Sequence, residues 1–314
     1  MRIVLVDPSR IGLKLMAKML GGGGHEVLPF TDGLAALDCL RGDASVDVLM
    51  TSFEVPGVSG LELCWEARLL AQARRPLYVI AMSSTHDRDR VVEALDSGAD
   101  DFVTKPPVPA ELFARLRAAE RVTRAQQELV RMATRDALTD LPNRRAFFER
   151  AADIVARRAD GLPLAMVMFD IDHFKRVNDT WGHDVGDEVL KVIAQVLAHG
   201  PGHPGRLGGE EFALLLDGWD LLDAHHEAER LRLAVAETPI AGSWGVTNVT
   251  ISLGVAEHTA GQSVDQLLKS ADVALYAAKT SGRNRTVATQ APPDVDRKST
   301  RLNSSHEWIS RMPS

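Results

Sequence analysis

Residues 1–120 alternate between short apolar runs and stretches with helical spacing, and this alternation limits the possible folds more than any other feature. The apolar runs fall at 3–6, 27–30, 46–50, 77–82 and 101–103. The helix-like stretches between them fall at 11–20, 34–40, 60–73 and 88–97. Strands that alternate with helices predict a parallel, doubly wound α/β sheet of five strands, which binds its ligands at the carboxyl ends of the strands.

One long helix is expected at 110–134, because this segment is rich in Ala, Arg, Leu, Glu and Gln and contains no Gly or Pro. Its apolar residues recur at mixed three- and four-residue steps: Leu112, Leu116, Ala119, Val122, Leu129 and Met132. A short dimeric coiled coil and a plain connecting helix both remain open, since one register puts Thr123 and Gln126 in the seam. We take 1–120 as the first domain and 110–135 as a connecting helix.

A second α+β unit is expected from 136 to 290, with helices packed on a mostly antiparallel sheet. The segment LAMVMFDID reads as a strand, RLGGEEFALLLD as a hairpin that turns at Gly208 and Gly209, and VTISLGVAEH as a further strand. Helices are expected in NRRAFFERA, HDVGDEVLKVIAQVLAH, LLDAHHEAERLRLAVAE and VDQLLKSADVALYAAKT, and NRTVAT reads as a last strand.

Composition limits the class of protein. The 314 residues carry a net charge of −7, which disfavours a nucleic-acid binder. Cys39 and Cys64 have no metal-binding or redox spacing and are expected to be buried thiols. No apolar run is long enough to cross a membrane, and MRIVLVDPSR lacks the layout of a signal peptide, so we expect a cytoplasmic protein with no membrane insertion.

The last residues differ from the rest of the chain. Residues 291–314 are polar and without periodicity, which predicts disorder. The stretch DRKSTRLNSSH resembles the translation of a sequencing-library adapter, so we expect 296–314 to be non-native.

Three features of the second unit suggest polyphosphate chemistry. A strand ends at Asp170 and Asp172 with Lys175 just beyond, Gly208 and Gly209 precede Glu210 and Glu211, and Lys279 and Arg283 lie near a helix end. Such chemistry needs Mg²⁺ held by a few carboxylates, glycine backbone that approaches phosphate closely, and cationic side chains for the remaining charge. Each feature alone is common, and their combination in this order is far more specific.

The second unit resembles the GGDEF family of diguanylate cyclases, on DALTDLPNRR, FDIDHFKRVNDTWGHDVGD, RLGGEEF and AKTSGRNR. The resemblance covers nearly all of it and implies a nucleotidyl-cyclase-like domain that converts two GTP into cyclic di-GMP and two pyrophosphates. It also implies a homodimer of C2 symmetry, because the 3′-hydroxyl held by one domain attacks the α-phosphate held by the other.

The resemblance also implies a role for each matching residue. Asp170 and Glu211, with the Ile171 carbonyl, are expected to bind Mg²⁺, with two ions per site and Mn²⁺ as an alternative. Glu210 is the expected base for the ribose hydroxyl, with contact to the metal as an alternative role, and Lys175 is the second catalytic residue. The remaining substrate contacts fall into a guanine group and a phosphate group: Asn178 and Asp187 for guanine, and Phe174, Lys175, Gly208, Gly209, Lys279 and Arg283 for the phosphates. Phe174 and Lys175 are expected in the loop after the strand. A carboxylate at Asp187 suits guanine, which offers two N–H donors where adenine has an acceptor at N1.

One departure from the family concerns product inhibition. Many members carry an RxxD motif before the two glycines, and His199 and Gly202 stand at those two positions here. We therefore expect no product inhibition through that site.

The first unit resembles a two-component receiver domain, on LVDPSR, MTSFEVPGVSG, MSS and VTKPP. A working receiver has an aspartate nucleophile after its third strand, two acidic residues after the first, a hydroxyl after the fourth and a lysine after the fifth. Here Asp7, Ser83 and Lys105 are present, Pro8 replaces one acidic residue, and Ser52 stands in place of the nucleophile. A serine without an adjacent base is a weak nucleophile and cannot form an acyl phosphate. We expect a degenerate receiver that dimerises or docks a partner protein.

These residues leave three candidate functions. The first is an active diguanylate cyclase. The second is a non-catalytic module that binds GTP or cyclic di-GMP, and the intact Gly208–Glu211 signature disfavours it. The third is a regulator driven by phosphorylation, which Ser52 disfavours.

Overall fold

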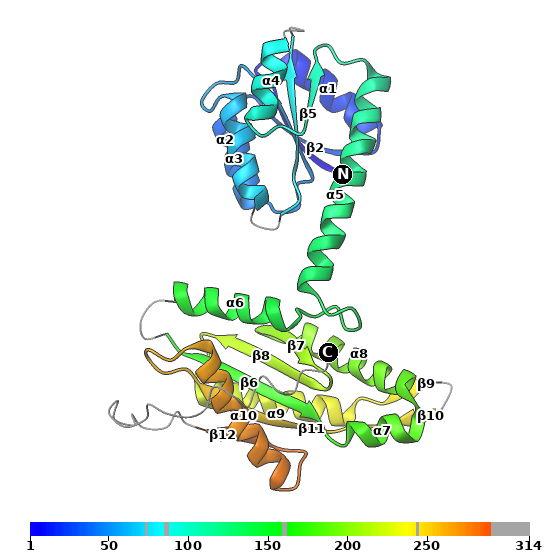
Figure 1. Cartoon of the computed structure of the whole chain (residues 1–314), viewed down its shortest axis with the longest axis vertical. Coiled ribbons are helices and arrows are strands. Elements are labelled where there is room, and N and C mark those ends of the chain that lie inside the picture. Colours follow the sequence, from blue (N-terminus) through cyan, green and yellow to red (C-terminus); the bar gives the residue numbers. More distant parts are fainter. Residues whose placement is uncertain (73–74, 85–87, 159–161, 243–244, 290–314) are drawn as a thin grey trace. The chain divides into compact units, whose positions relative to one another are not determined.

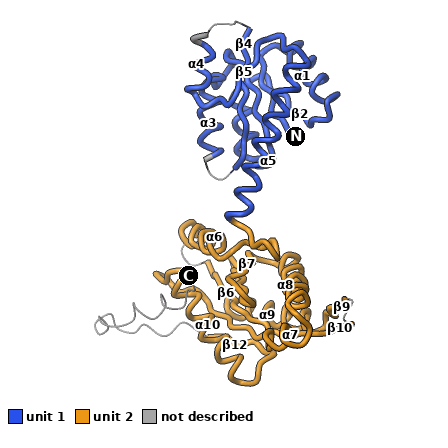
Figure 2. Tube along the Cα trace, turned by 45° about the vertical axis from the view of Figure 1, so that its right-hand side comes forward, with its two compact units in different colours: residues 1–133 blue, residues 134–314 orange. Residues whose placement is uncertain are grey.

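The computed structural model describes residues 1–72, 75–84, 88–158, 162–242 and 245–289. The chain divides into two compact units, 1–133 and 134–314 (Figure 2). The expectations for 291–314, disorder and a non-native end, fall outside the described residues. No described helix is long and apolar enough to cross a membrane.

Unit 1 is the expected five-stranded parallel sheet with helices on both faces (Figure 1). The strands pair in the order β2-β1-β3-β4-β5. Its elements are β1 (Arg2–Val6), α1 (Arg10–Gly22), β2 (Glu26–Phe30), α2 (Gly33–Gly42), β3 (Val48–Ser52), α3 (Gly60–Gln72), β4 (Tyr78–Ser83), α4 (Arg88–Asp96), β5 (Asp101–Thr104) and α5 (Pro109–Thr134).

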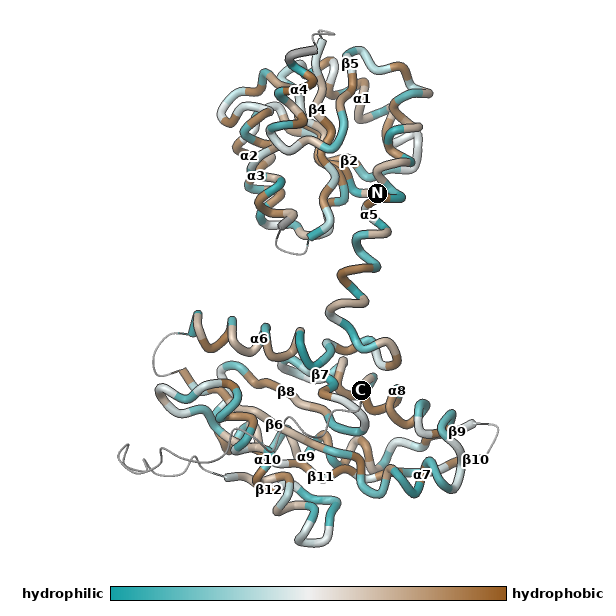
Figure 3. Tube along the Cα trace, viewed as in Figure 1, coloured by the Kyte–Doolittle hydropathy of each residue, from teal (hydrophilic) through white to brown (hydrophobic). Residues whose placement is uncertain are grey.

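Two apolar cores sit on the two faces of this sheet. Ile3, Leu5 and Met50 pack with residues of α1 and α5, whereas Val4, Val6 and Leu49 pack with residues of α2 and α3. Adjacent strand residues point to opposite faces, so a sheet covered on both sides needs continuous apolar runs. In Figure 3 central strands such as β4 and β6 are accordingly drawn brown, as hydrophobic segments.

One strand boundary differs from the sequence prediction. The run at 46–50 predicted a strand that ends before the hydroxyl residues, but β3 continues through Thr51 and Ser52, both buried. The backbone ladder continues because Ser52 is paired with Met82 of β4. Ser52 therefore lies inside the sheet at its carboxyl end.

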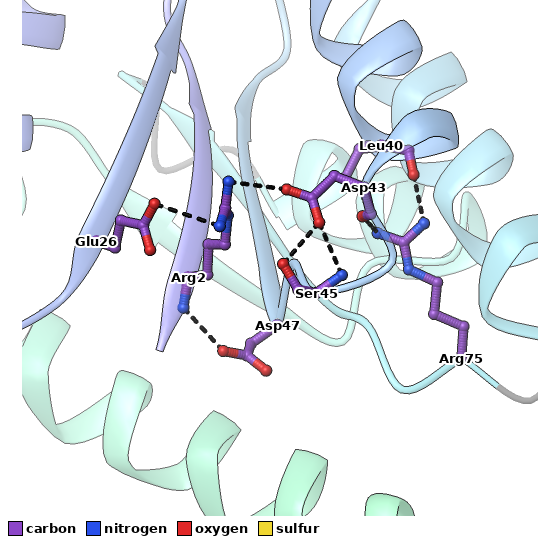
Figure 4. Close-up of polar contacts among 7 residues, drawn as sticks. All are labelled: Arg2, Glu26, Leu40, Asp43, Ser45, Asp47 and Arg75. Atoms are coloured by element: carbon purple, nitrogen blue, oxygen red, sulfur yellow. Dashed lines mark hydrogen bonds and ion pairs between the residues drawn. The ribbon is translucent and has the colours of Figure 1, made fainter. Parts of the chain in front are cut away.

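A polar cluster holds the opposite, amino end of this sheet (Figure 4). The Arg2 guanidinium contacts the Asp43 carboxylate at 3.0 Å and the Glu26 carboxylate at 3.4 Å. The backbone N–H of Arg2 donates to Asp47 Oδ2 at 2.8 Å. Arg75 donates to the carbonyls of Leu40 and Asp43. Gln127 of α5 lies 3.4 Å from Asp47 Oδ1, which ties α5 to the same end of the sheet.

Unit 2 is the expected mostly antiparallel sheet with helices. Its strands pair in the order β12-β11-β6-β8-β7, with the β11–β12 pair parallel and the other described pairs antiparallel, and β9 and β10 form a small separate hairpin. Its elements are α6 (Arg144–Arg157), β6 (Leu164–Ile171), α7 (Phe174–Trp181), α8 (His183–Ala198), β7 (His203–Gly208), β8 (Glu211–Asp217), α9 (Leu221–Glu237), β9 (Ile240–Gly242), β10 (Gly245–Thr247), β11 (Ile251–Glu257), α10 (Val264–Thr280) and β12 (Thr286–Thr289).

The two faces of this sheet are also covered. Val167 and Phe169 of β6 pack with residues of α8 and α9, whereas Met166 and Met168 pack with residues of α6 and α10. Alternate residues of a strand share a face, so Asp170 lies on the same face of the sheet as Met166 and Met168. Glu211 lies on the same face as Ala213 and Leu215 for the same reason. Both carboxylates therefore project on the α6 and α10 face.

Gly254 of β11 lets α10 approach the sheet closely. A Cβ atom at Gly254 would lie 2.1 Å from the Ala271 carbonyl oxygen and 2.2 Å from the Leu275 nitrogen. No side chain fits there without moving α10.

We predict that Gly254→Ala lowers the free energy of unfolding of unit 2 by about 1–3 kcal/mol, because the added methyl overpacks the contact with α10. Scanning calorimetry of the full chain would show one transition moved to lower temperature. Gly21→Ala in α1 serves as the control, because the added Cβ would meet no other segment of the chain within 4 Å. An unchanged thermogram for Gly254→Ala would contradict the close approach.

Candidate active site

The centre of the candidate site is the pair of strands β6 and β8. Asp170 lies directly opposite Glu211 in their antiparallel register. Asp170 is 7% exposed. Ile171 ends β6 with its side chain in the core, so only its backbone is available to a ligand. The two carboxylates of the metal hypothesis therefore lie on neighbouring strands.

Two glycines lie where β7 turns into β8: Gly208 is the last residue of β7, and Gly209 is the first residue of the turn. Their φ angles are 145° and 52°, and nothing lies within 4 Å of a Cβ at either position. Positive φ favours glycine, and the open space leaves the backbone accessible to a bulky anion. Glu210 completes the turn beside the Asp170 and Glu211 pair.

A salt bridge that sequence reasoning missed fixes this turn. Arg206 contacts the Asp136 carboxylate at 2.8 Å and donates two hydrogen bonds, of 3.0 and 2.7 Å, to the Gly209 carbonyl. Asp136 also accepts from the Thr139 N–H and hydroxyl. Burial alone would raise the pKa of Asp136, but the hydrogen bonds from Thr139 and Arg206 outweigh it and lower that pKa. The first motif of unit 2 thus anchors the glycine turn.

Two cations reach the site from the end of α10. Lys279 Nζ lies 2.8 Å from Asp170 Oδ2. Arg283 follows in the turn after α10, and its positive charge acts on Asp170 as well. Lys279 therefore contacts the carboxylate pair directly, and Arg283 acts on it through its charge.

The three acidic residues have raised pKa values. Burial is the largest cause at Asp170, Glu210 and Glu211, and the Asp170 charge raises the pKa of both glutamates further. Lys279 opposes these shifts at all three. Carboxylates that repel one another in a partly buried place favour a bound cation.

The guanine and phosphate candidates on α7 and α8 are also brought together. Phe174 and Lys175 were expected in a loop, and that expectation was wrong: they begin α7, after His173 in a left-handed conformation. A helix start presents N–H groups that lack intrahelical partners, which suits an anion. The Phe174 side chain is buried, so only its backbone can contact a ligand.

The two guanine candidates lie close together on α7 and α8. A Cβ at Gly186 would lie 2.0 Å from Asn178 Oδ1, so the Asn178 amide packs directly against Gly186. The next residue, Asp187, is exposed.

The donor set fits a divalent cation of the Mg²⁺ type. Such ions take oxygen ligands, often one or two carboxylates with the remaining positions left to phosphate and water. Asp170, Glu211 and the Ile171 backbone supply such oxygens, and Lys279 Nζ now neutralises Asp170 where a metal ion would. No group of three or more His, Cys, Asp or Glu side chains is placed to hold a metal within the described ranges.

The positions of the product-inhibition motif are filled by residues without the required charge. His199 caps α8 and its Nδ1 contacts the Gln195 carbonyl at 2.7 Å. Gly202 has φ of 83°, and a Cβ there would lie 2.5 Å from the Leu215 carbonyl oxygen. An aspartate would therefore not fit at Gly202 without a local shift. The absence of product inhibition through this site stays a prediction.

In unit 1 the residues of the receiver site bind one another. Ser52 Oγ donates to Asp7 Oδ2 at 3.0 Å. Lys105 Nζ donates to Asp7 Oδ2 at 2.9 Å and to Ser52 Oγ at 2.8 Å. Ser83 is buried at the end of β4. Neighbouring Glu54 contacts Arg90 at 3.4 Å and adds no carboxylate to this cluster.

Comparison with known proteins places both units. A model of the diguanylate cyclase GGDEF domain matches residues 133–285, and one of the response regulator receiver domain matches 3–117. The response regulator PleD of Caulobacter vibrioides is 36% identical over 306 residues, which cover 92% of this chain and 66% of PleD. The diguanylate cyclase DgcM of Escherichia coli K12 is 32% identical over 303 residues, which cover 90% of this chain and 73% of DgcM.

A solved structure agrees with these matches. The coiled coil and GGDEF domain of DgcB from Caulobacter crescentus, in complex with c-di-GMP, is 34% identical with a TM-score of 0.53. The alignment covers 57% of this chain and 98% of that chain.

We predict that Asp136→Asn loosens the glycine turn without unfolding unit 2. Loss of the charge-assisted contact with Arg206 should cost about 1.5 kcal/mol and raise amide hydrogen exchange at 208–211 roughly tenfold. Asp153→Asn removes the same charge from an exposed position on α6 and should leave this exchange unchanged. Equal exchange in both variants would contradict the anchoring role of Asp136.

Proposed function

Because the chain belongs to the GGDEF family of diguanylate cyclases and carries a receiver domain ahead of the GGDEF domain, we propose that it condenses two GTP molecules into cyclic di-GMP and two pyrophosphates. The chain spans 66% of the length of PleD, so the activity is proposed for this chain on its own residues. The observation that carries the proposal is the Asp170 and Glu211 pair, with Lys279 on Asp170 and the glycine turn beside it.

Each group then has a defined task. Asp170, Glu211 and the Ile171 carbonyl would hold Mg²⁺, or Mn²⁺ in its place, at up to two positions, and the metal would supply positive charge to the triphosphate. Lys279, Arg283, Lys175 and the backbone at Gly208, Gly209 and Phe174 hold the phosphates. Asn178 and Asp187 accept the guanine N–H groups. Together these contacts orient the substrate, which is the main contribution of the protein to such reactions.

Glu210 accepts the proton of the attacking hydroxyl. The 3′-oxygen forms a bond to the α-phosphorus, the bond from that phosphorus to the pyrophosphate oxygen breaks, and the proton moves to Glu210. Burial and the Asp170 charge raise the pKa of Glu210, which makes it a better proton acceptor than a free carboxylate.

Two copies of the domain must face each other, and α5 offers a surface for that pairing. Leu112, Leu116, Ala119 and Thr123 form its buried face. Val122, Leu129 and Met132 are 41%, 65% and 67% exposed, and with Ala125 they repeat at steps of three, four and three residues. Thr123 therefore lies outside the exposed stripe, and the heptad Val122, Ala125, Leu129, Met132 supports a parallel coiled coil of two chains.

We also propose that the receiver-like unit does not accept a phosphoryl group. Ser52 replaces the nucleophile. Lys105, Asp7 and Ser52 are already hydrogen-bonded to one another. Of the two acidic positions after β1, Asp7 fills one, and Pro8 stands at the other. This unit would then pair with a second copy or dock a partner protein.

The alternative is a module that binds GTP or cyclic di-GMP without catalysis. The intact carboxylate pair, Glu210 and the glycine turn favour the enzyme, because a binding module has no use for a base beside a metal site.

We predict that Glu211→Ala abolishes cyclic di-GMP formation from GTP and Mg²⁺, with a loss of at least about 100-fold, since one of two metal carboxylates is removed. Chromatographic assay of the product measures this. Glu149→Ala, an acidic residue of α6, should retain wild-type turnover. Substantial turnover by Glu211→Ala would overturn the metal assignment.

We predict that Leu129→Glu combined with Met132→Glu yields monomers in analytical ultracentrifugation and reduces turnover by at least about tenfold at micromolar protein, because charges enter the apolar seam. Arg124→Glu, outside the stripe, should leave the oligomeric state unchanged. A dimeric, fully active double variant would exclude α5 as the pairing surface.

We predict that acetyl phosphate adds no phosphate to the wild-type chain, because a neutral hydroxyl held by Lys105 and Asp7 is a poor nucleophile. Intact mass measurement checks this. A variant with both Ser52→Asp and Pro8→Asp, which restores the missing carboxylates, should gain the modification and so validate the assay. A label on the wild-type chain that hydroxylamine removes would contradict the proposal.

A further inference from the structure

Asp172 is a buried carboxylate to which the proposed reaction assigns no catalytic, metal-binding or substrate-binding role. It lies just beyond the end of β6 and is 6% exposed. The Thr250 and Ser252 hydroxyls donate to it at 2.7 Å each, and the Asn284 backbone N–H donates to it at 3.0 Å. Its own N–H donates to the Thr250 carbonyl at 2.8 Å. A buried charge with this many donors fixes the geometry of whatever supplies them.

One of those donors belongs to the turn that follows α10. In this turn Arg283 and Asn284 have φ angles of 61° and 45°. Two successive non-glycine residues in the left-handed region are unfavourable and persist only where surrounding contacts hold them. The hydrogen bond from the Asn284 N–H to Asp172 is one of those contacts.

Other contacts hold the two sides of the same turn. The Arg283 N–H donates to the Ala278 carbonyl at 3.1 Å, and the Arg285 carbonyl accepts from the Leu253 N–H at 2.9 Å. The Asn284 side chain accepts from Arg232 of α9 at 2.8 Å. Asp172 is the contact that joins the turn to the end of β6, two residues from Asp170.

We propose that Asp172 is a positioning residue for the triphosphate of the substrate. It holds the turn so that the Arg283 guanidinium faces the Asp170 and Glu211 edge of the sheet, where the β- and γ-phosphates of a nucleoside triphosphate would lie. Asp172 touches no phosphate and acts through Arg283. This inference rests on the proposed function, because Arg283 serves as a phosphate contact only if the site binds GTP.

The test is a binding measurement, which separates positioning from turnover. Calorimetry with Mg²⁺ compares α,β-methylene-GTP, which cannot release pyrophosphate, with GMP. Asp172→Asn should weaken binding of the GTP analogue by about tenfold, the scale of one charge-assisted contact, and change binding of GMP by less than about twofold. Asp153→Asn, on the exposed face of α6, should change neither.

A double-mutant cycle identifies the route of the effect. In an Arg283→Ala background, Asp172→Asn should weaken analogue binding by less than about a further twofold, because the group it positions is already gone. Equal losses for GMP and the analogue, or a full additional loss in the Arg283→Ala background, would show a general structural role and overturn the inference.

A milder variant covers the case in which Asp172→Asn fails to fold. Thr250→Val removes one donor and keeps the carboxylate, and it should weaken analogue binding by about threefold without affecting GMP. A folded Thr250→Val protein with wild-type analogue affinity would overturn the inference. Failure of the wild-type chain to bind either nucleotide would instead refute the proposed function itself, and the inference with it.

Discussion

The register between β6 and β8 determines whether unit 2 has a site. Asp170 and Glu211 face each other because these strands pair in antiparallel order, and both project on the face that α10 covers. A slip of one residue would turn either carboxylate to the α8 and α9 face. α10 comes close enough to place Lys279 on Asp170 because Gly254 offers no side chain at the contact. The two carboxylates, the glycine turn and the cations thus depend on one pairing.

The turn after α10 and the glycine turn are held by the same kind of interaction. In each, a carboxylate of a distant segment fixes the backbone of the turn, and in the turn after α10 that backbone conformation is unfavourable by itself because Arg283 and Asn284 have positive φ. Asp136 acts on the glycine turn through Arg206, and Asp172 acts directly on Asn284. These acidic residues lie outside the predicted set of contacts with substrate, and in our account they give the binding groups their rigidity.

Periodicity in the sequence predicted both five-stranded sheets, the long α5 helix and the order of elements apart from α7 and the β9–β10 hairpin, because buried strands and amphipathic helices leave clear patterns of apolar residues. It missed α7, since its first turn follows β6 after only two residues and most of its side chains are polar. It missed the partners of Asp172, which come from residues 78 to 112 positions away along the chain. It also ended β3 too early, because the backbone ladder continues past the last apolar side chain to Ser52.

We infer that this chain makes cyclic di-GMP between two copies of unit 2. The most direct test is the initial rate of cyclic di-GMP formation from GTP and Mg²⁺, measured over a wide range of protein concentration. We predict product formation, with a rate per protomer that rises with protein concentration and reaches a plateau once the chain is dimeric. Tight GTP binding with no product at any protein concentration would contradict it and identify a binding module instead.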